Sequence, residues 1–135
     1  MRVLVDTSVW SLAFRKKEKT EIEIKLINYL SELVRDLRVV MIGPIRQEIL
    51  SGISDEKKFV ELQSKLSVFS DWSIETEDYE LAAKYYNTCR KNGIQGSHID
   101  YLICAVAFNS NFSILTLDND FDNYKKYTGI LLAKP

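Results

Sequence analysis

Short apolar runs alternate along the chain with longer segments in which apolar residues recur every three or four positions. The short runs read as strands and cover Val3–Val5 and residues 39–42, 72–74, 113–117 and 130–133. The longer segments predict helices over residues 21–34, 44–50, 55–68, 77–92 and 97–109, besides an apolar helical stretch after Asp6. Strands that alternate with helices favour parallel neighbours joined by crossovers. The pattern therefore predicts an α/β fold, a three-layer α/β/α sandwich with a mostly parallel central sheet.

The length of 135 residues suits a single domain, residues 1–135, since the sequence contains no linker, repeat or low-complexity tract. The longest apolar run, "YLICAVAF", is too short to span a bilayer, and the amino terminus lacks the features of a signal peptide. Cys89 and Cys104 fall in predicted helices without metal-ligand spacing, which fits a reduced setting. We therefore expect a soluble, cytoplasmic protein with no membrane segment.

The charges are nearly balanced, because the chain contains 18 Lys and Arg residues and 19 Asp and Glu residues, which gives a net charge of -1. This balance excludes a protein that grips nucleic acid by overall charge alone. One local basic cluster, "RKKEK", contains Arg15, Lys16, Lys17 and Lys19. Such a cluster is either a solvated face or a contact for a polyanion, and the sequence does not decide between them.

Two aspartates follow predicted strands directly. Asp6 comes after Val3–Val5 and Asp118 comes after "SILTL". Each has a structural alternative, since Asp6 suits a helix N-cap and Asp118 suits a cap or turn. The alternating acids from Asp118 onward also mimic the start of a calcium loop, but Asn123 and Gly129 stand where that loop requires Gly and Glu. Because ligands collect beyond the carboxyl ends of parallel strands, Asp6 and Asp118 are candidates for one site.

Two further acids lie on predicted helices. Ser97 and Asp100 match a capping box, yet Asp100 also shares a helical face with apolar residues such as Ile103, where a carboxylate needs a partner. Glu48 can be an ordinary exposed glutamate. On a helical wheel it lies about 60° from Ile45, at the edge of the buried face.

Together these residues would bring four carboxylates to one rim of the sheet, where mutual repulsion raises pKa values unless a cation intervenes. Mg²⁺ and Mn²⁺ favour carboxylate oxygens and water. Zinc does not fit, because His98 is the single histidine and no sulfur cluster exists. We expect His98 to be a hydrogen-bonding group of a loop instead.

Four motifs in this order resemble those of the PIN-domain nucleases, and in length the chain is similar to the VapC toxins of bacterial and archaeal toxin-antitoxin pairs. The motifs are "VLVDTSVW" at the start, "GPIRQEIL" after the second strand, "HIDYLICAVA" on the apolar helix and "ILTLDNDF" near the end. Each motif alone is weak. The resemblance covers essentially the full length and rests on all four together.

The resemblance implies an Mg²⁺- or Mn²⁺-dependent ribonuclease that cuts RNA with a metal-activated water, leaving a 5′ phosphate and a 3′ hydroxyl. It further implies a VapB-type antitoxin and a homodimer. Because the net charge is near neutral, we also expect the basic cluster of Arg15, Lys16, Lys17 and Lys19 to contact the flanking RNA strand. By the same resemblance, the catalytic and metal-binding acids are Asp6, Glu48, Asp100 and Asp118, with Asp120 as an alternative fourth acid and with the supporting hydroxyls of Thr7, Ser8 and Thr116.

Other enzyme classes with acids at strand ends fit less well. Phosphatases of the haloacid dehalogenase type need a second Asp where this chain has Ser8, and the acidic pair and late lysine of receiver domains are not placed here. Two alternatives stay open: a PIN-like RNA-processing nuclease outside a toxin-antitoxin pair, and an inactive PIN-like binding module. The motifs do not specify which RNA is cut.

Overall fold

Four parallel strands form the central sheet. The computed structural model describes residues 1–135, with β1 at Val3–Val5, β2 at Val39–Val40, β3 at Ser113–Leu115 and β4 at Leu131–Leu132. The strand order is β2-β1-β3-β4, and every pairing is parallel. The prediction of a parallel sheet is therefore confirmed, although the strands are shorter than the apolar runs from which they were predicted.

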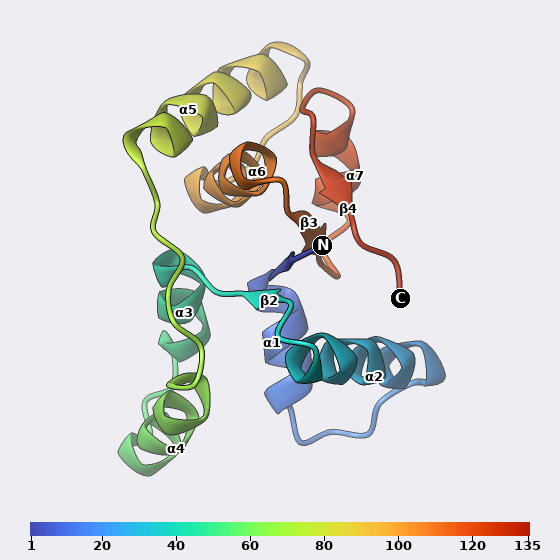
Figure 1. Cartoon of the computed structure of the whole chain (residues 1–135), viewed down its shortest axis with the longest axis vertical. Coiled ribbons are helices and arrows are strands. Elements are labelled where there is room, and N and C mark those ends of the chain that lie inside the picture. Colours follow the sequence, from blue (N-terminus) through green and yellow to red (C-terminus); the bar gives the residue numbers. More distant parts are fainter.

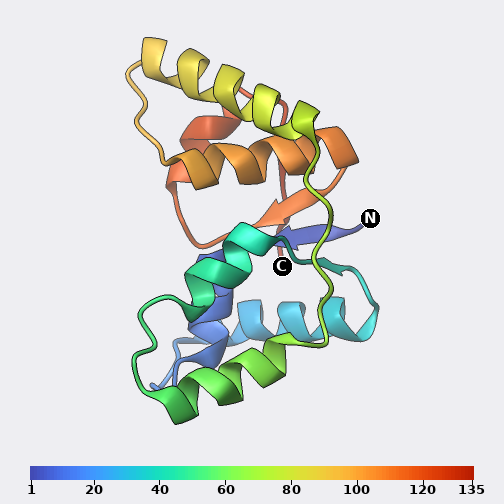
Figure 2. The ribbon, with the colours of Figure 1, turned by 90° about the vertical axis from the view of Figure 1, so that its left-hand side faces the viewer.

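Helices cover both faces of the sheet. Helices α5, α6 and α7 lie on one side and helices α1 to α4 on the other, which confirms the three-layer sandwich (Figure 1, Figure 2). None of the helices has the length and apolarity that a membrane span requires. Their bounds are α1 Thr7–Phe14, α2 Glu21–Arg35, α3 Gly43–Leu50, α4 Glu56–Leu66, α5 Thr76–Lys91, α6 His98–Ser110 and α7 Asp120–Lys125.

Local signals set the helix ends. A complete capping box starts α2, where the Glu23 N–H donates to Thr20 Oγ1 at 3.2 Å and the Thr20 N–H donates to Glu23 Oε1 at 2.9 Å. Helix α5 ends at Lys91, and Gly93, two residues later, has a positive φ of 75° that favours glycine. There the Gly93 and Ile94 N–H groups bond back to the Arg90 and Cys89 carbonyls, a Schellman motif. The chain can therefore turn sharply from α5 toward α6.

One prediction about secondary structure is wrong, and one helix was not predicted. Residues 72–74 do not form a strand, because only one parallel bridge, between Met41 and Asp71, joins this segment to the sheet. The chain then turns away into α5, and Trp72 packs edge-on against Phe112 with ring centroids 5.0 Å apart. The short helix α7 was not predicted. Its buried residues Phe121 and Tyr124, three positions apart, are the signal that could have revealed it.

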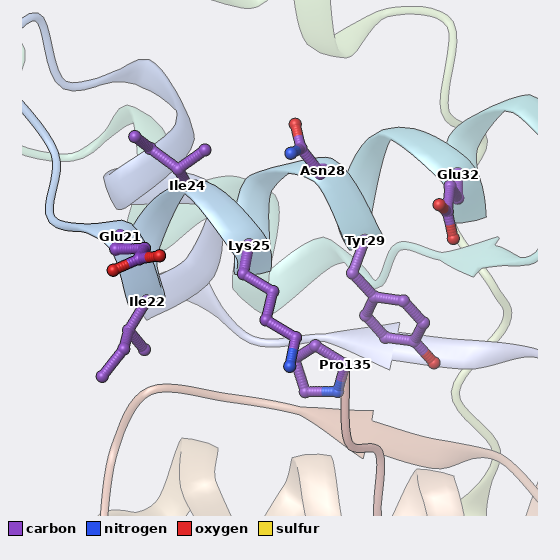
Figure 3. Close-up of a pocket in the computed structure, with 8 residues that line it drawn as sticks. All are labelled: Glu21, Ile22, Ile24, Lys25, Asn28, Tyr29, Glu32 and Pro135. Atoms are coloured by element: carbon purple, nitrogen blue, oxygen red, sulfur yellow. The ribbon is translucent and has the colours of Figure 1, made fainter.

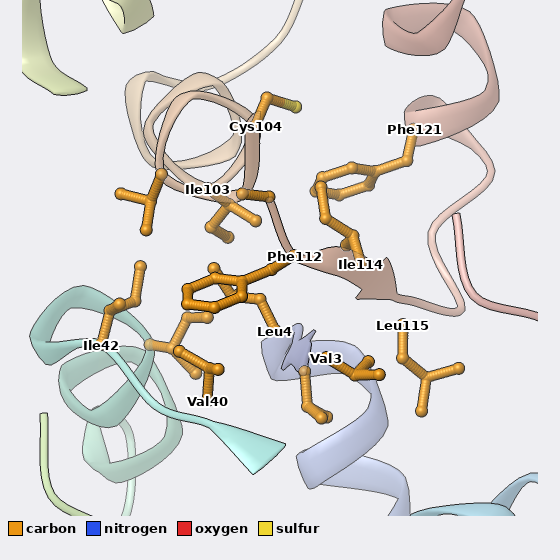
Figure 4. Close-up of a cluster of buried hydrophobic side chains, with 14 of the residues drawn as sticks. Val3, Leu4, Val40, Ile42, Ile103, Cys104, Phe112, Ile114, Leu115 and Phe121 are labelled. Atoms are coloured by element: carbon orange, nitrogen blue, oxygen red, sulfur yellow. The ribbon is translucent and has the colours of Figure 1, made fainter. Parts of the chain in front are cut away.

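The buried hydrophobic side chains form one cluster centred on the sheet and α6. Every α6 residue from Tyr101 to Ala107 is buried, and Figure 4 shows Ile103 pointing from α6 toward Phe112 and the strands. Cys89 and Cys104 are both free and buried. Because α6 is packed along this length, the residue just before the buried stretch, Asp100, has a fixed position.

Candidate active site

The carboxyl ends of β1 and β3 bring Asp6 next to Thr116. Val5 pairs with Leu115, and the Asp6 N–H donates to the Leu115 carbonyl at 2.9 Å. The next residue of each strand then lies side by side, and Thr116 Oγ1 donates to Asp6 Oδ2 at 2.8 Å. The parallel register thus positions the first acid.

Asp6 does not use its side chain to cap α1, so the capping alternative for this carboxylate is wrong. Its Oδ2 accepts from both Ser8 Oγ and Thr116 Oγ1, each at 2.8 Å. Oδ1 accepts no hydrogen bond and is not sealed from solvent, although the residue as a whole is only 6% exposed. Asp6 therefore presents one oriented, free oxygen at the edge of the sheet.

Glu48 joins this edge through the hydroxyl next to Asp6. Thr7 Oγ1 donates to Glu48 Oε1 at 2.7 Å, which connects α1 to α3. Ile45 and Ile49 are buried and fix the inner face of α3, while Glu48 itself is exposed. The predicted supporting role of Thr7 thus has a structural counterpart, since its hydroxyl orients a candidate acid.

Asp100 makes only half of the predicted capping box. Its N–H donates to Ser97 Oγ at 3.1 Å, but its carboxylate turns away and Oδ2 accepts from the Tyr124 hydroxyl at 2.8 Å. Burial raises the pKa of Asp100, and the charges of Asp6 and Asp118 raise it further, against the lowering effect of the Tyr124 hydrogen bond. These three acids are therefore electrostatically coupled, and Tyr124 is a site residue that the sequence did not reveal.

Asp118, three residues after the end of β3, is the fourth candidate acid. Its N–H donates to Thr116 Oγ1 at 2.9 Å, so a single hydroxyl connects Asp118 to Asp6. Asp118 Oδ1 accepts from the Asp120 N–H at 2.9 Å, so the predicted turn role is real and occupies one oxygen. Asp120 is exposed at the start of α7. It is Asp118, not Asp120, whose charge raises the pKa of Asp100.

No Lys or Arg neutralises these four carboxylates. The two ion pairs of the chain, Arg15 with Glu23 and Arg46 with Asp71, lie elsewhere. The carboxylates offer hard oxygen ligands, and the Oδ1 atoms of Asp6 and Asp100 accept no hydrogen bond.

The arrangement fits a hydrated divalent cation. No three acidic, Cys or His side chains are close enough to hold an ion on their own. Mg²⁺ typically keeps several waters and binds through one or two carboxylates, so an ion of that kind would take its remaining ligands from water. A fully protein-ligated site is excluded in this arrangement.

The predicted basic cluster is separate from the acids. It lies between α1 and α2, where Arg15 pairs with Glu23 at 2.9 Å and Lys19 Nζ donates to the Arg15 carbonyl. Lys16 and Lys17 are exposed and make no ion pair. Only these two cations of the cluster are therefore free to contact a ligand.

The expectation for His98 is wrong. His98 is the first residue of α6, its side chain makes no hydrogen bond, and its ring stacks on Tyr86.

The acidic edge is shallow. A hollow of about 120 Å³ lies beside Thr116 and Asp118, with Lys134 also in its lining. A larger hollow of about 610 Å³ lies on the exposed face of α2 beside the terminal Pro135, and it contains none of the four acids (Figure 3). The acids, not the size of a cavity, therefore identify the candidate site.

Replacing Asp100 by Asn is expected to stabilise the metal-free protein at neutral pH. A carboxyl whose pKa is raised on folding favours the folded state below its unfolded pKa, near the ordinary value of 3.8, and loses that contribution as pH rises through the folded pKa. The free energy of unfolding of Asp100→Asn should therefore exceed that of the native chain by an amount that grows across this window and then stays constant. Urea unfolding at several pH values, with chelator present, measures this difference. A constant difference at all pH values would contradict the coupling.

Comparison with known proteins agrees with this geometry. The sequence profile of the PIN domain family matches residues 3–127. The VapC ribonuclease Mb1587 of Mycobacterium bovis and the ribonuclease VapC11 of Mycobacterium tuberculosis are each 31% identical over 134 residues, covering 97% of both chains. A match of this length and identity establishes common descent along the whole fold.

Solved structures share the fold at lower identity. FitAcB from Neisseria gonorrhoeae superposes with a TM-score of 0.78 at 17% identity, over 98% of this chain and 97% of the other. VapBC2 from Rickettsia felis, bound to a DNA fragment from their promoter, gives a TM-score of 0.77 at 19% identity over 98% of each chain. With its strand-end acids, its parallel sheet and these relatives, the chain belongs to the PIN domain family, among the relatives of the VapC ribonucleases.

Proposed function

We propose that residues 1–135 act as one endoribonuclease domain that uses Mg²⁺ or Mn²⁺, the toxin of a VapBC-type pair, in the cytoplasm. The observation that supports this most is the electrostatic coupling of Asp6 and Asp118, which follow β1 and β3, with Asp100 of α6, while none of the three forms an ion pair with a basic side chain. The 31% identity to ribonucleases of the VapC group supports the same activity.

The four acids have different tasks in this proposal. Asp6 and Asp118, which both bond to the Thr116 hydroxyl, would hold the cation, and Glu48 and Asp100 would contact it through bound water. When bound, a divalent cation supplies positive charge for the phosphate and lowers the pKa of a water molecule. Ser8 and Thr116 orient Asp6, as outer hydrogen bonds do in metal sites.

Metal removal tests the activity. The purified chain should cleave RNA in Mg²⁺ or Mn²⁺, and cleavage should stop in EDTA and return when the cation is restored. Products should end in a 5′ phosphate and a 3′ hydroxyl. Cleavage that persists in EDTA would contradict the metal mechanism. A chain that binds RNA and Mn²⁺ without cutting would be the inactive binding module.

Lys16 and Lys17 are proposed to hold the RNA strand beside the site, because both are exposed and unpaired, whereas Arg15 and Lys19 already have partners. Each phosphate contact that is lost should reduce the salt slope of RNA affinity by about one. Replacing both lysines by Ala should therefore lower the slope by up to about two. An unchanged slope would remove the two lysines from the binding surface.

A VapB-type antitoxin and a homodimer are also proposed. The structural relatives that superpose on the chain include VapBC complexes. In this chain, Ile22 and Ile24 on α2 are 79% and 49% exposed beside the hollow of Figure 3, more apolar surface than a solvated helix needs. Light scattering of the isolated chain tests the dimer, and copurification with the product of the adjacent reading frame tests the antitoxin.

A further inference from the structure

Tyr86 of α5 is held as a rigid, partly exposed ring beside the start of α6. The His98 ring stacks on it with centroids 5.0 Å apart and an interplanar angle of 10°. Arg90 Nη1 donates to the Tyr86 hydroxyl at 2.8 Å, and its guanidinium lies 5.8 Å from the ring centroid. Neither His98 nor Arg90 belongs to the acidic site, and the fold does not explain why three planar groups gather here at the surface.

A hollow of about 200 Å³ borders this ring. We call it the Tyr86 hollow, and its lining consists of Tyr86, Arg90, Ile94, Gln95, Gly96 and Tyr101. His98 does not line it, and Tyr101, which does, packs edge-on against the Tyr86 ring with centroids 5.7 Å apart. The volume of the hollow is below the roughly 300–1,000 Å³ of sites for drug-sized ligands, and suits a single planar ring system. Its polar groups are an amide and a guanidinium, which hydrogen-bond bases and phosphates.

The floor of the Tyr86 hollow contains an unsatisfied polar group. The Tyr101 residue is 1% exposed, and its hydroxyl has no hydrogen-bond partner, the only buried side-chain atom of the chain in that state. Burial raises the pKa of Tyr101, and the neighbouring Cys89 thiol raises it further. An unpaired buried hydroxyl destabilises the fold, so a ligand that forms a hydrogen bond with it would recover stability.

Gly96 connects the hollow to the acids. A Cβ at Gly96 would lie 2.8 Å from the Tyr101 hydroxyl and 2.5 Å from the Tyr124 hydroxyl, which in turn donates to Asp100. Figure 2 shows that the connection between α5 and α6 lies at the edge of the sheet toward which the strands point. Asp6 and Asp118 follow the strands at this edge. Gly96 therefore lies between the Tyr86 hollow and the hydrogen bond from Tyr124 to Asp100.

We propose that the Tyr86 hollow binds one nucleobase of the single-stranded RNA, adjacent to the scissile phosphate. The base stacks on Tyr86, its edge contacts the Gln95 amide, and Arg90 contacts the sugar-phosphate backbone. Single-stranded RNA is commonly recognised in this way, by bases splayed out onto aromatic rings and read along their edges. The inference rests on the proposed ribonuclease function, and it names where that enzyme holds its substrate.

The experiment compares variants in metal-dependent cleavage of a labelled single-stranded RNA pool of mixed sequence. Loss of a base stack costs about 1–3 kcal/mol, so Tyr86→Leu should raise KM roughly 5- to 100-fold. Because the contact is made equally in the ground state and the transition state, kcat should stay within about twofold. Tyr86→Phe should keep the native KM, as should Tyr79→Leu, a control that removes an exposed tyrosine of the same helix outside the hollow.

Two further variants test the inference without changing Tyr86, in case Tyr86→Leu does not fold. Arg90→Gln should lower the salt slope of RNA affinity by about one. Tyr101→Phe should raise thermal stability in the free chain but weaken RNA binding, whereas a purely structural role predicts the first change without the second.

Several results would overturn the inference. One is a native KM in a folded Tyr86→Leu variant, and another is an equal rise in KM in Tyr79→Leu. A third is a change in the light-scattering mass of Tyr86→Leu without a change in its RNA affinity, because this would show that Tyr86 contacts protein instead of RNA. If the native chain itself fails to cleave, the proposed function is wrong instead, so the two failures are distinguishable.

Discussion

Asp6→Asn is expected to lower the rate of RNA cleavage at least about 100-fold, because loss of hydrogen-bond partners behind a metal ligand already costs about 10- to 100-fold. Asp6 is the most constrained acid of the site, with Oδ2 fixed by two hydroxyls at 2.8 Å and Oδ1 free. The Asn side chain keeps one oxygen that can accept a hydroxyl, so the fold should survive while the negative charge is lost. Single-turnover cleavage at saturating Mn²⁺ measures the effect.

Asp36→Asn is the matched control for this prediction. Asp36 is an exposed acid at the C-terminal end of α2, and the same change there removes one negative charge without touching the site. Its cleavage rate should stay at the native value. A folded Asp6→Asn protein that cuts RNA as fast as Asp36→Asn would show that the strand-end carboxylate has no catalytic role.

Ile103→Ala is expected to destabilise the chain by about 2–5 kcal/mol, as deletion of a fully buried Ile side chain does in other cores. Ile103 is 0% exposed and packs between α6 and the sheet (Figure 4). Since total stabilities are roughly 5–15 kcal/mol, this single change should remove a large share of the total. Urea unfolding followed by circular dichroism gives the difference.

Ile103→Val is the control that distinguishes the effect of a large cavity from the effect of any substitution in α6. It deletes one methylene and should lower the free energy of unfolding by only about 0.5–1.5 kcal/mol. We also expect Ile103→Ala to slow cleavage at temperatures where it is still folded, because Asp100 lies one turn earlier on the same helix. Equal costs for the Val and Ala variants would show that the site collapses around the smaller side chain, and the position of Asp100 would then not depend on this packing.

The sequence predicted the elements whose signals are local. Val3–Val5 was placed without error, since three buried apolar residues end directly at Asp6. The same reasoning failed at residues 72–74. Trp72 and Ile74 are apolar and follow the single bridge between Met41 and Asp71, but Ser73 Oγ already donates to Glu75 just before α5. A short apolar run has no periodicity that distinguishes a strand from an extended lead into a helix.

Asp6 and Asp118 were predicted as candidates from their positions after strands, and Glu48 and Asp100 from their positions on helices, but the hydrogen-bond partners of these acids were not predicted. Tyr124 reads in the sequence as one more aromatic residue, and only the folded chain brings its hydroxyl to Asp100, 24 positions away. Likewise His98 was expected to form hydrogen bonds, and instead it stacks on Tyr86 from a different helix. Contacts between distant segments depend on tertiary packing, which a single sequence does not display.

The central claim is that the acids of β1 and β3 together bind a divalent cation, and direct titration with Mn²⁺ tests it. Electron paramagnetic resonance reports the free ion. The native chain should bind Mn²⁺ saturably, Asp6→Asn and Asp118→Asn should bind at least about 10-fold more weakly, and Asp120→Asn should stay close to native. Native affinity in both the Asp6 and Asp118 variants, or no saturable binding by the native chain, would contradict the account.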